Sequence, residues 1–205
     1  YFNNASFSHG DKQILKNATF MINPGEKILL QGANGTGKTT ILKLMAGLYR
    51  PDSGEIFYGN QDISSIHISC LADTYGYISQ HSNIIEGDVF SNIALNEKID
   101  EHRADEVLGD LNLLHTKNTH PKSLSQGEQQ RLNICRVIYN KKPVMIIGDE
   151  IFSNIDKDNQ NAIVELFDKH YKDITVILIL HENVGFQFDR VLTLSNGKVF
   201  EEEQN

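Results

Sequence analysis

The chain has 205 residues, 40% of them hydrophobic, and its 19 basic and 27 acidic side chains give a formal net charge of −8. This length fits one or two domains with an ordinary core, and the composition excludes a disordered chain. The acidic balance disfavours nucleic acid as a partner, because phosphate backbones select basic surfaces.

The first 80 residues are rich in predicted strands. Strand-like runs between turn signals cover residues 2–7, 18–22, 27–30, 55–58 and 75–78. Between the third and fourth runs, apolar residues at helical spacing predict a helix that ends near Tyr49. The chain begins at Tyr1, within strand-like sequence, so we expect it to be a piece of a longer polypeptide.

A glycine-rich loop, Gly32-Ala-Asn-Gly-Thr-Gly-Lys38-Thr39, fits the phosphate-binding pattern G-x-x-x-x-G-K-[ST]. Its glycines let backbone N–H groups line an anion-sized concavity, while Lys38 reaches the phosphates and the Thr39 hydroxyl can ligate magnesium. The alternative is an ordinary glycine-rich turn, but the strand before it and the helix after it favour a nucleotide site. The predicted contacts are Asn34, Gly35, Thr36, Gly37, Lys38, Thr39 and Thr40.

Residues 84–140 change to a helical pattern. An apolar stripe predicts one helix from Arg103 to Leu114, and another is expected over 126–139. After Pro143 we expect strands at 144–147 and 174–180, a helix at 158–171, and a hairpin around Ser195-Asn196-Gly197. Strands and helices that alternate around a phosphate loop predict an α/β fold, with a mostly parallel sheet and helices on both faces.

Two adjacent carboxylates, Asp149 and Glu150, end the predicted strand at 144–147. Ligands of α/β sheets collect at the carboxyl ends of strands. Asp149 can therefore hold magnesium and Glu150 can polarise an attacking water. A solvated acidic pair is the plain alternative, but the preceding phosphate loop favours a catalytic one.

The run Leu124-Ser-Gln-Gly-Glu128 predicts the start of a helix. Ser125 can cap it, and Glu128 three residues later completes a capping box. A helix start with serine and glycine in its first turn also offers free N–H groups and the positive end of the dipole, which suit a γ-phosphate.

At these residues the sequence resembles the ATP-binding cassette family, in its transporter ATPase domain. Leu124–Glu128 stands at the LSGGQ signature and Asp149-Glu150 at the Walker B end. Other motifs follow in the family's order: Gln80 as the Q-loop glutamine, Ser153–Asp156 as the D-loop and His181 as the switch histidine.

The resemblance implies a fold and a division of the chain. The fold is that of a P-loop NTPase with a RecA-like core of mostly parallel sheet, an N-terminal antiparallel β subdomain and an inserted helical subdomain. We expect one ATPase domain over 1–205, with its β subdomain and core at 1–82 and 140–205, and its helical subdomain at 83–139.

The resemblance also implies site roles, with ATP and Mg²⁺ as cofactors. Glu150, His181 and Gln80 would be catalytic, and Thr39, Gln80 and Asp149 would hold the metal. His9 would stack on adenine. A head-to-tail dimer would place each nucleotide between the phosphate loop of one copy and the second copy's Ser125, Gln126 and Gly127.

Four positions depart from the family pattern. Gln126 replaces a glycine, and Glu128 replaces a glutamine and brings a carboxylate that repels phosphate unless it turns back to its cap. Gly148 replaces a bulky apolar residue, which predicts looser packing under Asp149. His9 stands where the family has an aromatic ring.

Residues 83–93 and the terminal hairpin resemble exporter-type transporters, although the acidic loop that exporters place before the signature is absent. We therefore expect a motor cassette at the cytoplasmic face of the cell membrane, working with a membrane domain upstream or in a separate subunit, and with a second cassette. Two alternatives stay open: a weakly hydrolysing regulatory cassette, and an ATPase that acts outside transport.

Overall fold

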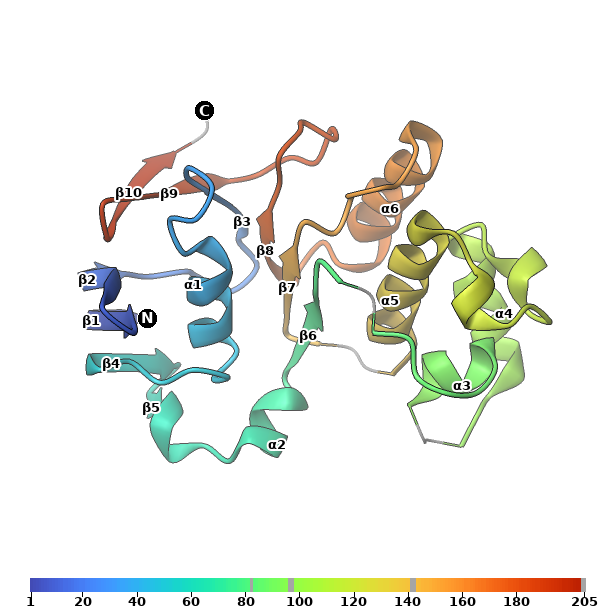
Figure 1. Ribbon diagram of the computed structural model, residues 1–205, viewed down its shortest axis with the longest axis horizontal. Coiled ribbons are helices and arrows are strands. Elements are labelled where there is room, and N and C mark those ends of the chain that lie inside the picture. Colours follow the sequence, from blue (N-terminus) through green and yellow to red (C-terminus); the bar gives the residue numbers. More distant parts are fainter. Residues whose placement is uncertain (82, 96–97, 141–142, 204–205) are drawn as a thin grey trace.

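The computed structural model describes residues 1–81, 83–95, 98–140 and 143–203, and its framework is a pair of β-sheets with helices beside them (Figure 1). The larger sheet has six strands in the order β10-β9-β3-β8-β7-β6. All neighbouring pairs in it are parallel except β9 and β10. Its strands are β3 Lys27–Gln31, β6 Tyr75–Ile78, β7 Met145–Asp149, β8 Thr175–Ile179, β9 Arg190–Ser195 and β10 Lys198–Glu203.

The central strand β8 separates two hydrophobic cores. Because side chains alternate along a strand, Val176 and Leu178 belong to one core while Ile177 and Ile179 belong to the other. All four are buried, as a parallel strand covered on both faces requires. The continuous apolar run of this segment is explained by that double coverage.

The smaller sheet is antiparallel, in the order β2-β1-β4-β5, and lies to the left of the helix α1 in Figure 1. Residues of this sheet, of α1 and of one face of the large sheet share a core. α1 therefore lies between the two sheets, with its N-terminal end at the phosphate loop. The elements are β1 Phe2–His9, β2 Lys12–Phe20, α1 Lys38–Met45, β4 Ser53–Tyr58 and β5 Gln61–Asp62.

The other core is covered by helices, which Figure 1 shows to the right of β6 and β7. Aspartates cap three of them, as Asp88, Asp100 and Asp156 each accept the N–H of the residue three positions on. Within the described ranges, no helix is long and apolar enough to cross a membrane. The helices beside this core are α3 Val89–Ala94, α4 Glu101–Asp110, α5 Gln126–Asn140 and α6 Lys157–His170. α2 Ile68–Ala72 instead places Leu71 in the core that the small sheet shares with α1. Short 3₁₀ turns lie at Ile63–Ser65, Leu114–Thr116 and Pro121–Ser123.

Several predicted boundaries are wrong for local reasons. α1 ends at Met45 rather than near Tyr49, because Gly47 at φ 68° turns the chain. α4 spans 101–110 rather than 103–114, and Leu114 is half exposed after a left-handed turn at Asn112. β2 begins at Lys12, six residues before the expected start; its added first half pairs the exposed Lys12 and Gln13 with the buried Ile14 and Leu15, a pattern that does not alternate as a half-buried strand does.

Candidate functional site

The phosphate loop joins β3 to α1, as predicted. Its last glycine, Gly37, has φ 107°, a left-handed conformation that favours glycine. A Cβ at this position would lie 2.1 Å from Cγ2 of Ile14 on β2. The loop is therefore pressed against the antiparallel sheet, and the N–H groups of the first turn of α1, which have no intrahelical acceptors, are left for a ligand.

Lys38 is buried, and its ammonium group lies across the loop that precedes it. Its Nζ donates to the carbonyl oxygens of Gly32 at 2.8 Å and Ala33 at 3.3 Å. Thr36 turns away from a ligand, because its N–H and hydroxyl both bond to the carbonyl of Ala33. Contact between Thr36 and nucleotide stays a prediction.

A pocket of about 600 Å³ opens beside this loop and gathers residues from six separate segments of the chain. It brings together eleven of the predicted site residues, and Lys12 and Ile14 line it as well. Lys12 donates to the carbonyl of Gly35 at 2.7 Å. These two β2 residues were not singled out from the sequence, because this strand was expected to begin only at residue 18. The predicted residues in the pocket are His9, Asn34, Gly35, Gly37, Lys38, Thr39, Thr40, Gln80, Asp149, Glu150 and His181.

Glu150 is held between the Q-loop and switch residues. Gln80 Nε2 donates to Glu150 Oε2 at 2.6 Å, and His181 Nε2 lies 2.5 Å from Glu150 Oε1. Glu150 has φ 52°, a left-handed conformation that is uncommon outside glycine. The backbone turn at the end of β7 thus aims this carboxylate at both partners, and both of its oxygens are engaged.

Asp149 is the last residue of β7 and is 4% exposed. Burial raises the pKa of its carboxyl group above the usual value, and the charge of Glu150 acts in the same direction. A hydrogen bond from the Thr39 side chain and the nearby lysines partly oppose this shift. Hydroxyl, amide and carboxylate oxygens are ligands that Mg²⁺ accepts alongside phosphate oxygens, so Thr39, Gln80 and Asp149 fit that metal.

The packing beneath Asp149 is tight despite Gly148, contrary to the sequence-based expectation. A Cβ on Gly148 would lie 2.6 Å from Leu178 Cδ2 and 2.7 Å from Ile151 Cγ2. Both neighbours are fully buried. Their side chains therefore occupy the space that a larger residue would take.

His9 lies at the rim of the pocket and is exposed, whereas Phe7 is buried. Both rings stack on Tyr49, with centroids 6.2 Å and 5.4 Å from it. They therefore face the same way, as strand alternation predicts, but only His9 is accessible. The role of His9 in adenine binding stays a prediction.

Residues 125–127 lie away from this pocket and do not line it. Figure 1 shows α5 and α1 on opposite sides of β7 and β8. A Cβ on Gly127 would lie 2.4 Å from the carbonyl oxygen of Asn154, so the start of α5 packs directly on the predicted D-loop. Ser125 and Gln126 are exposed at that end of the helix.

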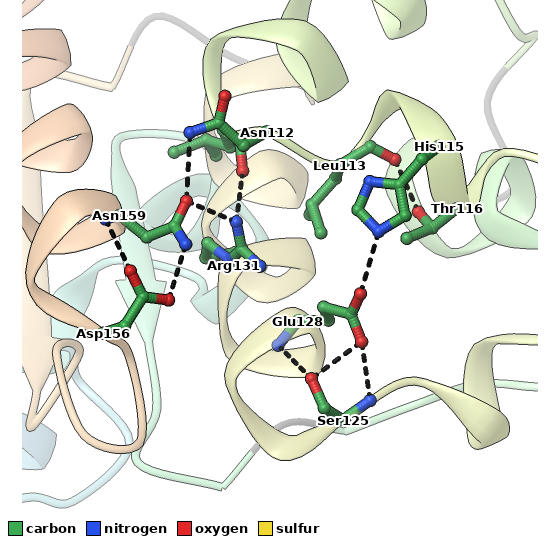
Figure 2. A network of polar contacts seen from close by, with 10 residues as sticks. Asn112, Leu113, His115, Thr116, Ser125, Glu128, Arg131, Asp156 and Asn159 are labelled. Carbon is green, nitrogen blue, oxygen red and sulfur yellow. Dashed lines mark hydrogen bonds and ion pairs between the residues drawn. The ribbon is translucent and has the colours of Figure 1, made fainter.

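Figure 2 shows polar contacts that join the D-loop to α5. Asn159 donates through its backbone and side chain to the Asp156 carboxylate, at 3.1 Å and 2.6 Å. The Asn159 amide oxygen accepts from Arg131 at 2.6 Å and from Asn112 at 3.0 Å. Arg131 is buried and also donates to the carbonyl of Leu111. The predicted D-loop and α5 are thus connected by hydrogen bonds within one chain.

Comparisons with known proteins agree with this geometry. The family model described as ABC transporter matches residues 15–153. The cell division ATP-binding protein FtsE of Escherichia coli K12 is 33% identical over 92% of this chain and 90% of its own. A bacterial Atm1-family ABC exporter with ATP bound has TM-score 0.92 and 25% identity over 99% of this chain, which spans 38% of the exporter chain. A dimeric post-hydrolysis state of the ATP-binding cassette MJ0796, bound to ADP and Pi, has TM-score 0.87 and 27% identity over 100% of this chain and 98% of that one.

Proposed function

This chain belongs to the ABC transporter family, and we propose that it is the motor cassette of a membrane transporter. It is an ATP-binding cassette and an ATPase, homologous to transporter ATP-binding proteins and to cassettes that form dimers. In the proposal, two copies pair head to tail around ATP and drive a membrane domain from the cytoplasmic face of the membrane. The observation that carries it is the pocket in which Lys38 and Thr39 face Gln80, Asp149, Glu150 and His181.

Each pocket residue has a physical task in this proposal. Lys38 neutralises phosphate charge from a buried position, where the attraction between opposite charges is stronger than in water. Thr39, Asp149 and Gln80 would hold Mg²⁺, which would neutralise charge on the phosphates and orient them. Glu150 polarises the attacking water as a general base, and His181 donates a hydrogen bond to the γ-phosphate.

The two hydrogen bonds on Glu150 imply an order of events. Gln80 and His181 each take one lone pair on the two oxygens of Glu150, so the access of a water to this carboxylate depends on how these two side chains lie. In the proposal, Gln80 releases Oε2 before Glu150 takes a proton from the attacking water, which opens the second lone pair on that oxygen. A displacement of Gln80 on nucleotide binding would therefore widen access to the base and tie hydrolysis to a loaded site.

We also propose that residues 83–139 act as a helical subdomain that responds to this change, attached to the core formed by 1–82 and 140–205. Gln80 lies at the junction, and the α5 side chain Asn133 donates to the carbonyl of Ser79 at 3.3 Å. A displacement of the Q-loop therefore reaches α5 through a direct contact.

The experiment is steady-state ATPase measurement with and without Mg²⁺, on wild type and Glu150→Gln. Loss of a general base costs about 10²–10⁴-fold in rate, so we expect turnover to fall at least about 100-fold while ATP binding persists. Absence of Mg²⁺-dependent turnover in the wild type at high protein concentration would contradict the motor role.

The similarity to FtsE favours a second candidate, a cassette that serves cell division rather than transport. FtsE is named as a cell division protein. Co-purification of the chain from membranes distinguishes the two: a multi-span transport domain supports the first candidate, and a division-site complex supports the second.

A further inference from the structure

The donors of Ser125 are both taken by a carboxylate of the same chain. Glu128 Oε2 accepts the Ser125 N–H at 2.8 Å and the Ser125 hydroxyl at 2.7 Å, as Figure 2 shows. In return the Ser125 oxygen accepts the Glu128 N–H at 3.3 Å. An ionised carboxylate only accepts hydrogen bonds, so the hydroxyl proton points at Glu128 and is not available to another anion.

A second partner fixes Glu128 in this position. His115 Nε2 lies 3.0 Å from Glu128 Oε1, and this nitrogen must carry the proton because the carboxylate cannot donate. Hydrogen bonds from Ser125, and then from His115, lower the pKa of Glu128. The Glu128 side chain is 21% exposed, so its charge is only partly screened by water.

The family signature has a neutral glutamine at this position, and the difference is one of charge rather than shape. In the proposed pair, the partner's γ-phosphate approaches this end of α5 and needs the donors that Glu128 occupies. Charge-assisted hydrogen bonds are about twice as strong as neutral ones. A carboxylate therefore holds Ser125 more firmly than an amide does, and it also repels the incoming phosphate.

We propose that Glu128, oriented by His115, is a resident competitor of the partner's γ-phosphate and sets the ATP concentration at which two copies pair. This inference rests on the proposed function, because it presumes a nucleotide shared between copies. Glu128 is a positioning residue that acts through Ser125. A purely structural cap predicts the opposite sign, since weakening the cap loosens α5 and hinders pairing.

The test measures the dimer fraction against ATP concentration in the presence of Mg²⁺, by analytical ultracentrifugation. All proteins carry Glu150→Gln, so that ATP is not consumed during the run. The test variant adds Glu128→Gln. The matched control adds Glu106→Gln, which removes one carboxylate from another exposed His–Glu pair, with His102 at 3.4 Å on α4.

We expect Glu128→Gln to lower the ATP concentration for half-maximal pairing by about tenfold in low salt, from the removal of one like charge near the phosphate. In 0.5 M salt the gain should shrink to about twofold, because screening weakens charge repulsion. Glu106→Gln should match the parent. ATP affinity of the separate monomers should be equal in all three, because Glu128 does not line the nucleotide pocket.

Two outcomes separate this inference from the function on which it rests. If the parent pairs with ATP but Glu128→Gln needs the same or more ATP, Glu128 is only a helix cap and the inference is wrong. If neither protein pairs at any ATP concentration, the shared-nucleotide function fails and the inference falls with it.

Discussion

Substitution of Gly148 by alanine tests whether the space beneath Asp149, the proposed metal ligand, is filled. The added Cβ would lie 2.6 Å from Leu178 Cδ2 and 2.7 Å from Ile151 Cγ2, well inside normal contact. The backbone there is not left-handed, so the cost is overpacking alone. Extra methylenes in a packed core cost about 1–3 kcal/mol, and we expect a loss of about 2 kcal/mol in the free energy of unfolding.

Leu178→Val provides the matched test, because it removes the Cδ atoms that crowd the new Cβ. We expect about 1 kcal/mol for this change alone and about 2 kcal/mol, rather than 3, for the double variant. Urea unfolding of the four proteins measures this coupling. A loss below about 0.5 kcal/mol for Gly148→Ala, or strict additivity, would refute the packing argument and restore the expectation of an open site.

Two further predictions concern charge. Lys38→Ala should weaken ATP binding by at least about 100-fold, which is the scale of a lost buried charge pair. Lys43→Ala, on the same helix but outside the pocket, should leave ATP binding unchanged. Equal ATP affinity of Lys38→Ala and wild type would contradict the site. Hydrogen bonds from Ser91 and Ser125 lower the pKa values of Asp88 and Glu128 in the folded protein. These two carboxylates therefore add their full stabilisation to the free energy of unfolding above about pH 4.5, and this stabilisation is lost as pH falls through their folded pKa values. Urea unfolding between pH 6 and 3 should show this loss, reduced in Asp88→Asn; a variant that loses as much as wild type would contradict the assignment.

Much of the fold could be predicted because buried parallel strands are continuous apolar runs. β8 and β7 stand out for this reason, and the Asn196-Gly197 turn marks the last hairpin, where both residues have positive φ as a two-residue turn requires. The first half of β2 was missed because its exposed residues come as one adjacent pair and its buried residues, Ile14 and Leu15, as the next, which breaks the alternation of a half-buried strand. α2 was missed because five residues carry too little periodicity to distinguish a helix from a turn.

The site was predictable as a set of motifs but not as a set of contacts. Parallel strands deliver their carboxyl ends to one edge, so Glu150 and His181 were expected near the phosphate loop, while Gln80 was expected there from the family resemblance. The sequence could not say that both oxygens of Glu150 are engaged, nor that His115, from outside every motif, holds Glu128. The interpretation of Gly148 was wrong because neighbouring side chains adapt to a small residue in ways that one position does not reveal.

The close packing of Gly127 on the Asn154 carbonyl has a consequence for timing in a pair. In the proposed pair, the end of α5 that would meet the partner's nucleotide rests on the Asn154 backbone, shortly after Glu150, the proposed general base of the same chain, with no side chain between Gly127 and that carbonyl. A displacement of the Asn154 backbone would therefore displace the start of α5 as well. The ATP hydrolysis cycles of two such cassettes would therefore be coupled, because a change at the active site of one would move the surface that binds the nucleotide of the other.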